Sequence, residues 1–187
     1  FDLYIVKEAV FSEWEAHLKM FEHFNMLQHW QYGMAKEQTG KWKAVRFIIL
    51  KDGKLVALAQ FLVMMLPFLG GIARMNRGPL LSKLIESDCR ESISYDVIQT
   101  LVDEAQKRHW WIIQIAPELP YSPETAEGLR KIGLRHLNYV PSSDSGYIDL
   151  LPDKDQLLMR LKAKWRNCLR KGILLGIKVT HASGNSN

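Results

Sequence analysis

The feature that most limits the fold is an uncharged run of 19 residues at positions 55–73. A run of this length can span a bilayer as a helix or lie in the protein as buried strands. Pro67 and the pair Gly70-Gly71 interrupt it, and both residue types disfavour a continuous helix. Asp52-Gly53 just before it is a strong signal for a tight hairpin turn. The sequence therefore favours two buried strands over a membrane-spanning helix.

Signals for strands and helices alternate along the first 140 residues. The first expected elements are a strand at 3–6, a helix opened by a capping box at Ser12 and Glu15, and a helix at 28–39 closed by a left-handed Gly40. Strands at 45–50, 55–66 and 71–75 follow. The last are a helix at 94–108, a strand at 110–116, a helix started by Ser122-Pro123 and ended by Gly133, and a strand at 136–140. The strand at 110–116 is nearly all apolar, which predicts burial on both faces. This order predicts an α/β fold with a mixed, mostly antiparallel central sheet flanked by helices. It resembles the order in GNAT-type N-acetyltransferases, the acyl-CoA N-acyltransferase-like fold.

Charge is divided unevenly along the chain. No acidic residue occurs from Gln156 onward, and residues 156–187 carry +7, whereas the whole chain is +5 and residues 1–155 therefore carry −2. A terminal segment this basic is typical of one that meets an anionic partner. The Pro- and Ser-rich stretch 141–146 is the best boundary candidate. We expect a first GNAT-like domain at 1–141 and the opening elements of a second, truncated one at 142–187.

The basic segment should form a strand at 146–150, an amphipathic helix at 153–171 and a strand at 177–180. Its cations can form a solvated face, or can contact substrate phosphate, a tRNA backbone or an acidic partner surface. Arg166 and Arg170 are the preferred anion ligands. The apolar stripe of the helix must be buried, so we expect either a homodimer or a weakly ordered end. That stripe consists of Leu157, Leu161, Trp165 and Cys168.

Four short motifs occur in an order known from one enzyme family. They are Leu27-Gln28-His29-Trp30-Gln31-Tyr32-Gly33 with Lys36 three residues later, Arg77-Gly78-Pro79, Tyr147-Ile148-Asp149-Leu150, and the helix Lys164 to Gly172 followed by Gly176-Ile177-Lys178-Val179. Together they resemble the FemABX aminoacyltransferases. Members of that family have two GNAT-like domains and move an amino acid from aminoacyl-tRNA onto the peptide of a peptidoglycan precursor. The departures are His29, where Ser is commoner, and the absence of the later strands of the second domain.

The resemblance implies the binding residues. It makes Lys36 a contact for the phosphates of the precursor, a UDP-MurNAc-peptide or its lipid-linked form, although the same lysine could simply complement a helix dipole. Trp30 belongs to the same motif and is a further candidate substrate contact. Arg77, held in a rigid turn, either contacts an anion in the substrate cleft or pairs with a carboxylate. No catalytic base is identifiable, and the chain alone is expected to be inactive, as a precursor-binding portion.

Two other functions fit parts of the sequence. The basic C-terminal helix alone predicts an RNA-binding or protein-interaction module. An acyl-CoA-dependent N-acyltransferase is the further alternative, but CoA needs backbone N–H groups of a glycine-rich turn around its pyrophosphate. The corresponding stretch 74–79 offers one glycine, Gly78, followed by Pro79 with no N–H to donate. We therefore expect no cofactor.

Cysteine and histidine usage bears on the compartment. Cys89 and Cys168 lie far apart without a CxxC spacing, which favours free thiols in a reducing compartment. The six histidines form no pair with metal-binding spacing, so no metal is expected. The N-terminal sequence does not resemble a signal peptide. These observations predict a cytoplasmic protein, free or peripheral at the inner face of the membrane.

Overall fold

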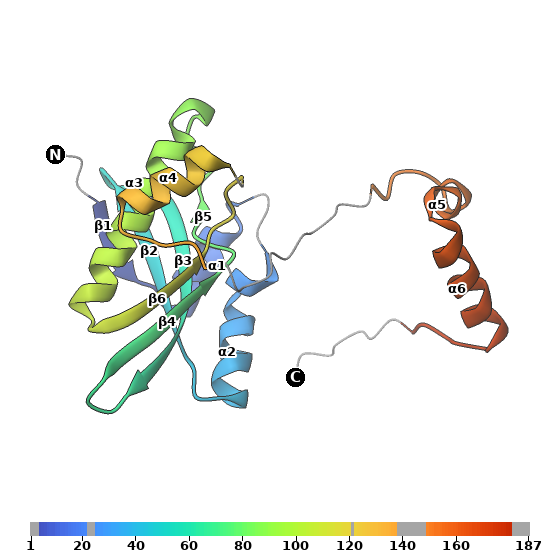
Figure 1. Cartoon of the computed structure of the whole chain (residues 1–187), viewed down its shortest axis with the longest axis horizontal. Helices are drawn as coiled ribbons and strands as arrows, with labels where there is room; N and C mark the ends of the chain where they lie inside the picture. Colours follow the sequence, from blue (N-terminus) through green and yellow to red (C-terminus); the bar gives the residue numbers. More distant parts are fainter. Residues whose placement is uncertain (1–3, 22–24, 121, 138–148, 181–187) are drawn as a thin grey trace. The chain divides into compact units, whose positions relative to one another are not determined.

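The computed structural model describes residues 4–21, 25–120, 122–137 and 149–180. The chain divides into two compact units, Phe1–Leu137 and Asn138–Asn187. The first unit contains the sheet and most of the helices (Figure 1). The predicted strand at 136–140 is not formed at residues 136–137, and its remainder lies outside the described residues.

The first unit is built on a sheet of six strands with the order β1-β2-β3-β4-β6, and β5 pairs with β3. Neighbouring strands are antiparallel except for β4 and β6, which are parallel. The strands are β1 (Tyr4–Glu8), β2 (Lys43–Lys51), β3 (Lys54–Leu66), β4 (Gly70–Asn76), β5 (Leu80–Leu81) and β6 (Trp110–Ala116). The predicted mixed, mostly antiparallel sheet flanked by helices is confirmed.

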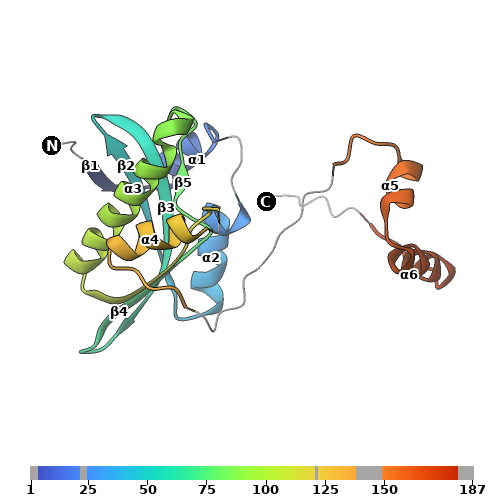
Figure 2. The same ribbon diagram turned by 45° about the horizontal axis from the view of Figure 1, so that its top comes forward.

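Helices cover both faces of this sheet (Figure 2). They are α1 (Phe11–Leu18), the 3₁₀ helix η1 (Met26–Gln28), α2 (Trp30–Thr39), α3 (Ser87–Lys107) and α4 (Pro123–Lys131). Strand residues alternate between the faces, so Phe47 and Ile49 pack in the cluster with α3. Ile48 and Leu58 point to the opposite face and pack in the cluster with α1. The core therefore lies in two layers, one on each side of β2 and β3.

The uncharged run forms β3 and β4, as the sequence predicts. Asp52 and Gly53 both have positive φ, 50° and 75°, which is the geometry of a tight hairpin turn between β2 and β3. Phe68, with φ 63°, lies in the turn between β3 and β4. Among the described residues, no helix combines the length and the apolar character needed to cross a membrane.

Four helix boundaries differ from the sequence predictions. The prediction of a capping box at Ser12 is wrong. Helix α1 begins at Phe11, one residue before Ser12, so its N-cap is Val10, which forms no side-chain capping hydrogen bond. The helix predicted at 28–39 begins at Trp30 because η1 occupies the preceding residues. Gly40 is extended, with φ −157°, rather than left-handed, and the chain continues directly towards β2. Helix α3 begins at Ser87, seven residues earlier than predicted.

Helix α4 has the predicted ends. The Ser122 hydroxyl accepts a hydrogen bond from the Thr125 N–H (3.1 Å), with Pro123 in the first turn. Gly133 has φ 83°, the left-handed conformation that follows a helix. Both ends are set by local chemistry, which explains why the sequence alone identified them.

Strand β6 forms where predicted, but the prediction that both of its faces are buried is wrong. Trp111 is 66% exposed and Ile112 is 52% exposed. The reason is that β6 pairs only with β4 in the described sheet, so it is an edge strand. The apolar composition therefore overestimates how much of this strand is covered.

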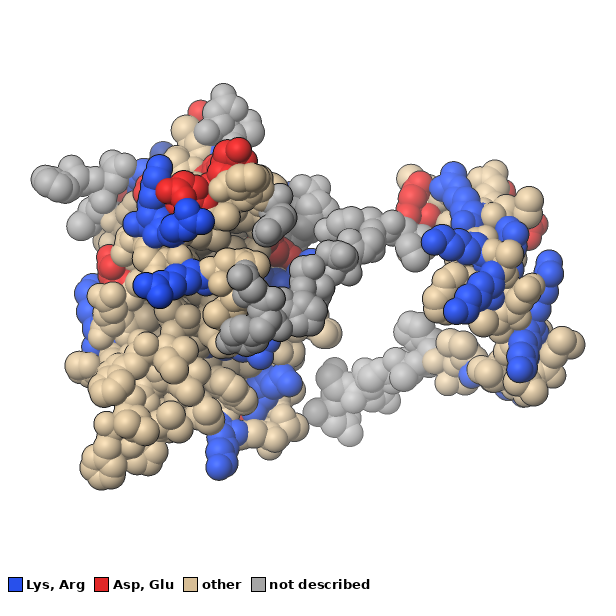
Figure 3. Space-filling model, viewed as in Figure 1, with Lys and Arg blue, Asp and Glu red and all other residues tan. Residues whose placement is uncertain are grey.

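The described part of the second unit, residues 149–180, contains two short helices rather than the single predicted one, and Lys and Arg side chains lie along it (Figure 3). They are α5 (Lys154–Arg160) and α6 (Ala163–Leu174). Leu161 separates them with ψ 141°, an extended conformation. The Arg166 guanidinium donates to the Met159 carbonyl (2.9 Å), which satisfies a C-terminal carbonyl of α5 at the break.

The ends of this unit are partly as predicted. Asp153 is the N-cap of α5 and accepts from the Gln156 N–H (2.8 Å). The strand predicted at 177–180 is wrong: Gly176, with φ 71°, ends α6, and the Ile177 N–H bonds to the Gly172 carbonyl (3.1 Å). Residues 149–150 are not in a strand, and the rest of the strand predicted at 146–150 lies outside the described residues.

A candidate anion-binding cavity beside helix α2

The first motif begins with a glutamine that joins three elements. Gln28 is fully buried at the end of η1. Its side-chain oxygen accepts from the Gln60 N–H of β3 (2.8 Å), and its amide nitrogen donates to the Asn76 carbonyl at the end of β4 (2.7 Å). Both ends of the amide are used, so the entry to α2 is fixed against two strands.

Trp30 and Arg46 form the next part of the same contact. The Trp30 carbonyl accepts from Arg46 Nη2 (2.9 Å), and the Arg46 guanidinium lies 3.6 Å from the centroid of the Trp30 ring. Arg46 Nε donates to the Gln60 side-chain oxygen (2.7 Å). Burial lowers the pKa of the Arg46 guanidinium to about 10, against the opposing effect of the Glu37 charge. Trp30 therefore packs α2 onto the sheet and does not line the cavity described below.

Gly33 lets α2 approach this network closely. A Cβ atom at this position would lie 2.4 Å from Arg46 Nη2 and 2.5 Å from the Gln60 side-chain oxygen. Both distances are far inside van der Waals contact, so a larger residue requires the buried polar network to move. The spacing from Gln28 to Gly33 is thus explained by helix-on-sheet packing.

Lys36 lies one turn after Gly33 and lines a cavity of about 240 Å³ between α2, β3 and β4. The cavity contains two cationic side chains, Lys36 and Arg74, and no acidic one. Its lining residues are Leu27, Tyr32, Lys36, Trp42, Leu62, Arg74 and Asn76. Among the described residues no ion pair engages either cation, and the nearby Glu37 carboxylate accepts instead from the Ala44 N–H (2.9 Å). This arrangement favours an anionic ligand.

Aromatic rings complete the cavity wall. The Lys36 ammonium lies 5.5 Å from the centroid of the Tyr32 ring, and Trp42 contributes a second aromatic side chain. Ring faces of this kind can stack on a planar heterocycle. Of these lining residues, only Lys36 was predicted from the sequence; Arg74, Tyr32, Trp42 and Asn76 were not. Alternation along β4 places Arg74 and Asn76 on one face, which is the signal that could have found them.

Arg77 lies next to the cavity in sequence but does not line it. Its Nε atom forms an ion pair with Glu118 (3.0 Å), with both side chains partly exposed, and its carbonyl accepts from the Asn25 side chain (2.7 Å). Of the two sequence interpretations of Arg77, the structure shows the pairing with a carboxylate. Arg166 and Arg170 lie on α6 of the second unit, where Arg166 is half-buried and Arg170 is exposed.

The turn after β4 offers few free donors. The Gly78 N–H donates to the Ala116 carbonyl (3.2 Å), and Pro79 has no N–H. A Cβ on Gly78 would lie 2.7 Å from the Gln28 amide nitrogen, so this turn is packed against the same buried glutamine. These contacts leave no glycine-rich cradle for a pyrophosphate at Arg77-Gly78-Pro79.

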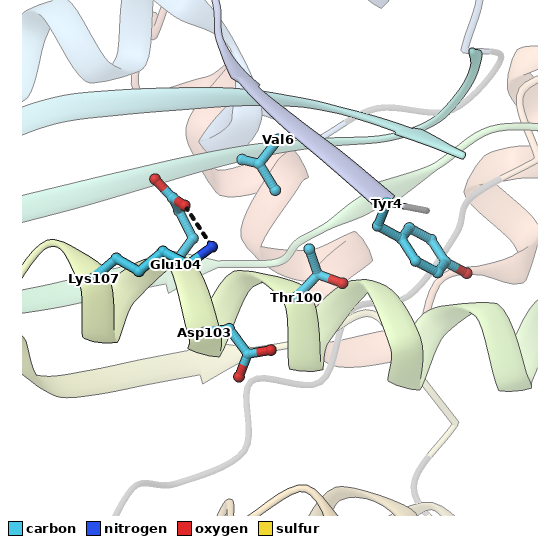
Figure 4. Close-up of a pocket in the computed structure, with 6 residues that line it drawn as sticks. All are labelled: Tyr4, Val6, Thr100, Asp103, Glu104 and Lys107. Carbon is cyan, nitrogen blue, oxygen red and sulfur yellow. Dashed lines mark ion pairs between the residues drawn. The ribbon is translucent and has the colours of Figure 1, made fainter. Parts of the chain in front are cut away.

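A second cavity, of about 350 Å³, lies between β1 and α3 (Figure 4). Its polar side chains have partners inside and outside the cavity: the Tyr4 hydroxyl donates to Asp96 (3.2 Å), which is not a lining residue, and Glu104 pairs with Lys107 (3.9 Å) and with Arg108 (2.7 Å). Burial and the Asp96 carboxylate raise the pKa of the Tyr4 hydroxyl. Because acidic and basic side chains are mixed in its lining, this cavity indicates no particular ligand. Among the described residues no cluster of His, Cys, Asp or Glu could hold a metal ion.

Comparisons with known proteins identify the fold. No family model and no curated protein matches the sequence. A crystal structure of FemX matches with a TM-score of 0.65 and 18% identity, and the match covers 90% of this chain. The chain spans 43% of the length of that FemX chain. A crystal structure of a probable acetyltransferase matches with a TM-score of 0.50 and 10% identity, over 78% of this chain and 99% of that one. The chain thus has a GNAT-like, N-acyltransferase-type fold.

Proposed function

We propose that this chain is the precursor-binding portion of a FemABX-like aminoacyltransferase, which uses aminoacyl-tRNA as the donor. In this proposal the cavity beside α2 binds the phosphates of a nucleotide-linked peptidoglycan precursor such as UDP-MurNAc-peptide. The observation that carries it is the meeting of Lys36 and Arg74 in one cavity without an acidic lining residue. The order of the four sequence motifs and the fold shared with FemX support the same function.

The chemistry of the cavity suits a nucleoside diphosphate. Lys36 supplies a compact positive charge and Arg74 a planar set of donors, which together can contact two neighbouring phosphate groups. Tyr32 and Trp42 offer ring faces to a base. A volume of about 240 Å³ is below the ~300–1,000 Å³ that encloses a whole small ligand. The cavity therefore holds the diphosphate and part of the nucleotide, while the peptide lies outside it.

Replacing Lys36 with alanine should weaken precursor binding about 10- to 100-fold, because a charge-assisted contact is lost. Isothermal titration calorimetry with UDP-MurNAc-pentapeptide measures this change. Lys41→Ala is the matched control, since Lys41 is an exposed lysine that does not line the cavity. Equal affinities of wild type and Lys36→Ala would contradict the assignment, as would a folded wild-type chain that binds no precursor.

An acyl-CoA-dependent N-acyltransferase is the second candidate, because the fold is shared with acetyltransferases. The occupied Gly78 N–H and Pro79 argue against a CoA pyrophosphate in that turn. We expect acetyl-CoA at millimolar concentration to leave the melting temperature unchanged in a thermal shift assay. A clear upward shift would favour this second candidate over the first.

A further inference from the structure

Helix α6 has a continuous apolar face. Trp165, Leu169 and Ile173 follow one another at four-residue spacing, so they lie in line along the helix. Their exposed fractions are 60%, 44% and 66%. Three large apolar side chains in one exposed row are unusual for a helix of only 12 residues.

The cations of α6 lie mostly away from this row. At about 100° per residue, Lys164 and Lys171 lie opposite the row, Arg170 lies on its flank, and Arg166 lies beside Ile173. Leu174, which is 86% exposed, also lies on the far side, between Arg170 and Lys171. No acidic residue occurs in α6 or anywhere from Gln156 to the end of the sequence. Cations this close repel one another unless an anionic surface neutralises them.

Nothing within the described part of the second unit covers either face. No residue of α5 or α6 is buried. Ile177 turns back towards Gly172 after the helix, but it is itself 67% exposed. A partner that offers an apolar region next to anionic groups would match both faces of α6.

We propose that α6 lies in the plane of an anionic phospholipid bilayer at its water interface. The row Trp165, Leu169 and Ile173 would enter the acyl boundary, and Lys164, Arg170 and Lys171 would contact lipid phosphates. An RNA backbone matches the charge but leaves the apolar row in water. A second copy of the chain matches the apolar row but brings two acid-free helices together. Of these three partners, the bilayer interface is the one that matches both faces, and this inference is independent of the proposed precursor site.

Sedimentation of the full chain with large unilamellar vesicles tests the proposal. We expect binding to vesicles of phosphatidylcholine with 30% phosphatidylglycerol, and at least tenfold weaker binding to pure phosphatidylcholine. Each Lys or Arg near an anionic surface strengthens binding about fivefold. The triple variant Lys164→Gln, Arg170→Gln, Lys171→Gln should thus bind about a hundredfold more weakly. A matched control neutralises three lysines of the first unit, Lys41, Lys43 and Lys131.

A second variant tests the apolar face. Trp165→Ala, Leu169→Ala and Ile173→Ala together should reduce vesicle binding at least tenfold, while alanine preserves the helix and circular dichroism checks the fold. The control replaces Met26 and Leu84, which are more exposed in the first unit (72% and 78%), with alanine. Absence of vesicle binding by wild type, or unchanged binding by the apolar variant, overturns the proposal. If the apolar variant still binds RNA and the wild type does not bind vesicles, the basic side of α6 is an RNA contact instead. If light scattering shows a concentration-dependent dimer that the apolar variant abolishes, the apolar row is a dimer contact instead.

Discussion

Gly33→Ala is expected to lower the free energy of unfolding of the first unit by about 2–3 kcal/mol. The new methyl group would lie 2.4 Å from Arg46 Nη2 and 2.5 Å from the Gln60 side-chain oxygen, and both partners are buried. Either α2 must move away from the sheet or the Arg46–Gln60 hydrogen bond must break. The gain in helix propensity from alanine, about 1 kcal/mol, offsets only part of this cost.

Urea unfolding followed by circular dichroism measures the effect through the shift in midpoint. Gly40→Ala is the matched control at the end of the same helix. Its backbone is extended, and an added Cβ would meet its nearest neighbours at 3.5 Å, an ordinary contact. We expect Gly40→Ala to be neutral within about 0.5 kcal/mol. A Gly33→Ala midpoint as high as that of Gly40→Ala would show that the network adapts without loss.

The elements that the sequence predicted correctly depend on local chemistry. The β2–β3 hairpin follows from Asp52-Gly53, and the ends of α4 follow from Ser122 and Gly133. The break between α5 and α6 was missed because Leu161 and its neighbours are good helix formers. It coincides with a contact between the Arg166 side chain and the Met159 carbonyl, which no local propensity reveals.

In the candidate site, too, the sequence predicted single residues but not the residues that they meet in space. Resemblance to a family motif identified Lys36, but its partner Arg74 belongs to β4, and their meeting depends on which sheet face α2 covers. For Arg77 the sequence left two interpretations open, an anion contact in the substrate cleft and a pair with a carboxylate, and it could not name the carboxylate. The structure pairs Arg77 with Glu118, a residue that follows β6 and that no motif links to it. Spatial partners across the sheet are the part that single-sequence reasoning could not supply.

Gln28→Leu is expected to destabilise the first unit by about 3 kcal/mol. Leucine has a similar volume but no polar atoms, so the Gln60 N–H and the Asn76 carbonyl would lose their partners in a buried region. The same urea unfolding measurement applies, with Gln38→Leu as the control, since Gln38 is exposed on α2 and its side chain forms no hydrogen bond with the described residues.

The same variant also tests how the cavity is held together. Gln28 bonds to the backbone of Asn76, whose side chain lines the cavity with Lys36 and Arg74. If Gln28 positions this wall, Gln28→Leu should weaken binding of UDP-MurNAc-pentapeptide about tenfold, even though Lys36 and Arg74 are unchanged. The measurement is made in conditions where the variant is still folded. Lost stability with unchanged affinity would restrict Gln28 to a packing role. Unchanged stability would mean that water replaces both hydrogen bonds, and that the glutamine of the motif does not anchor η1 to the sheet.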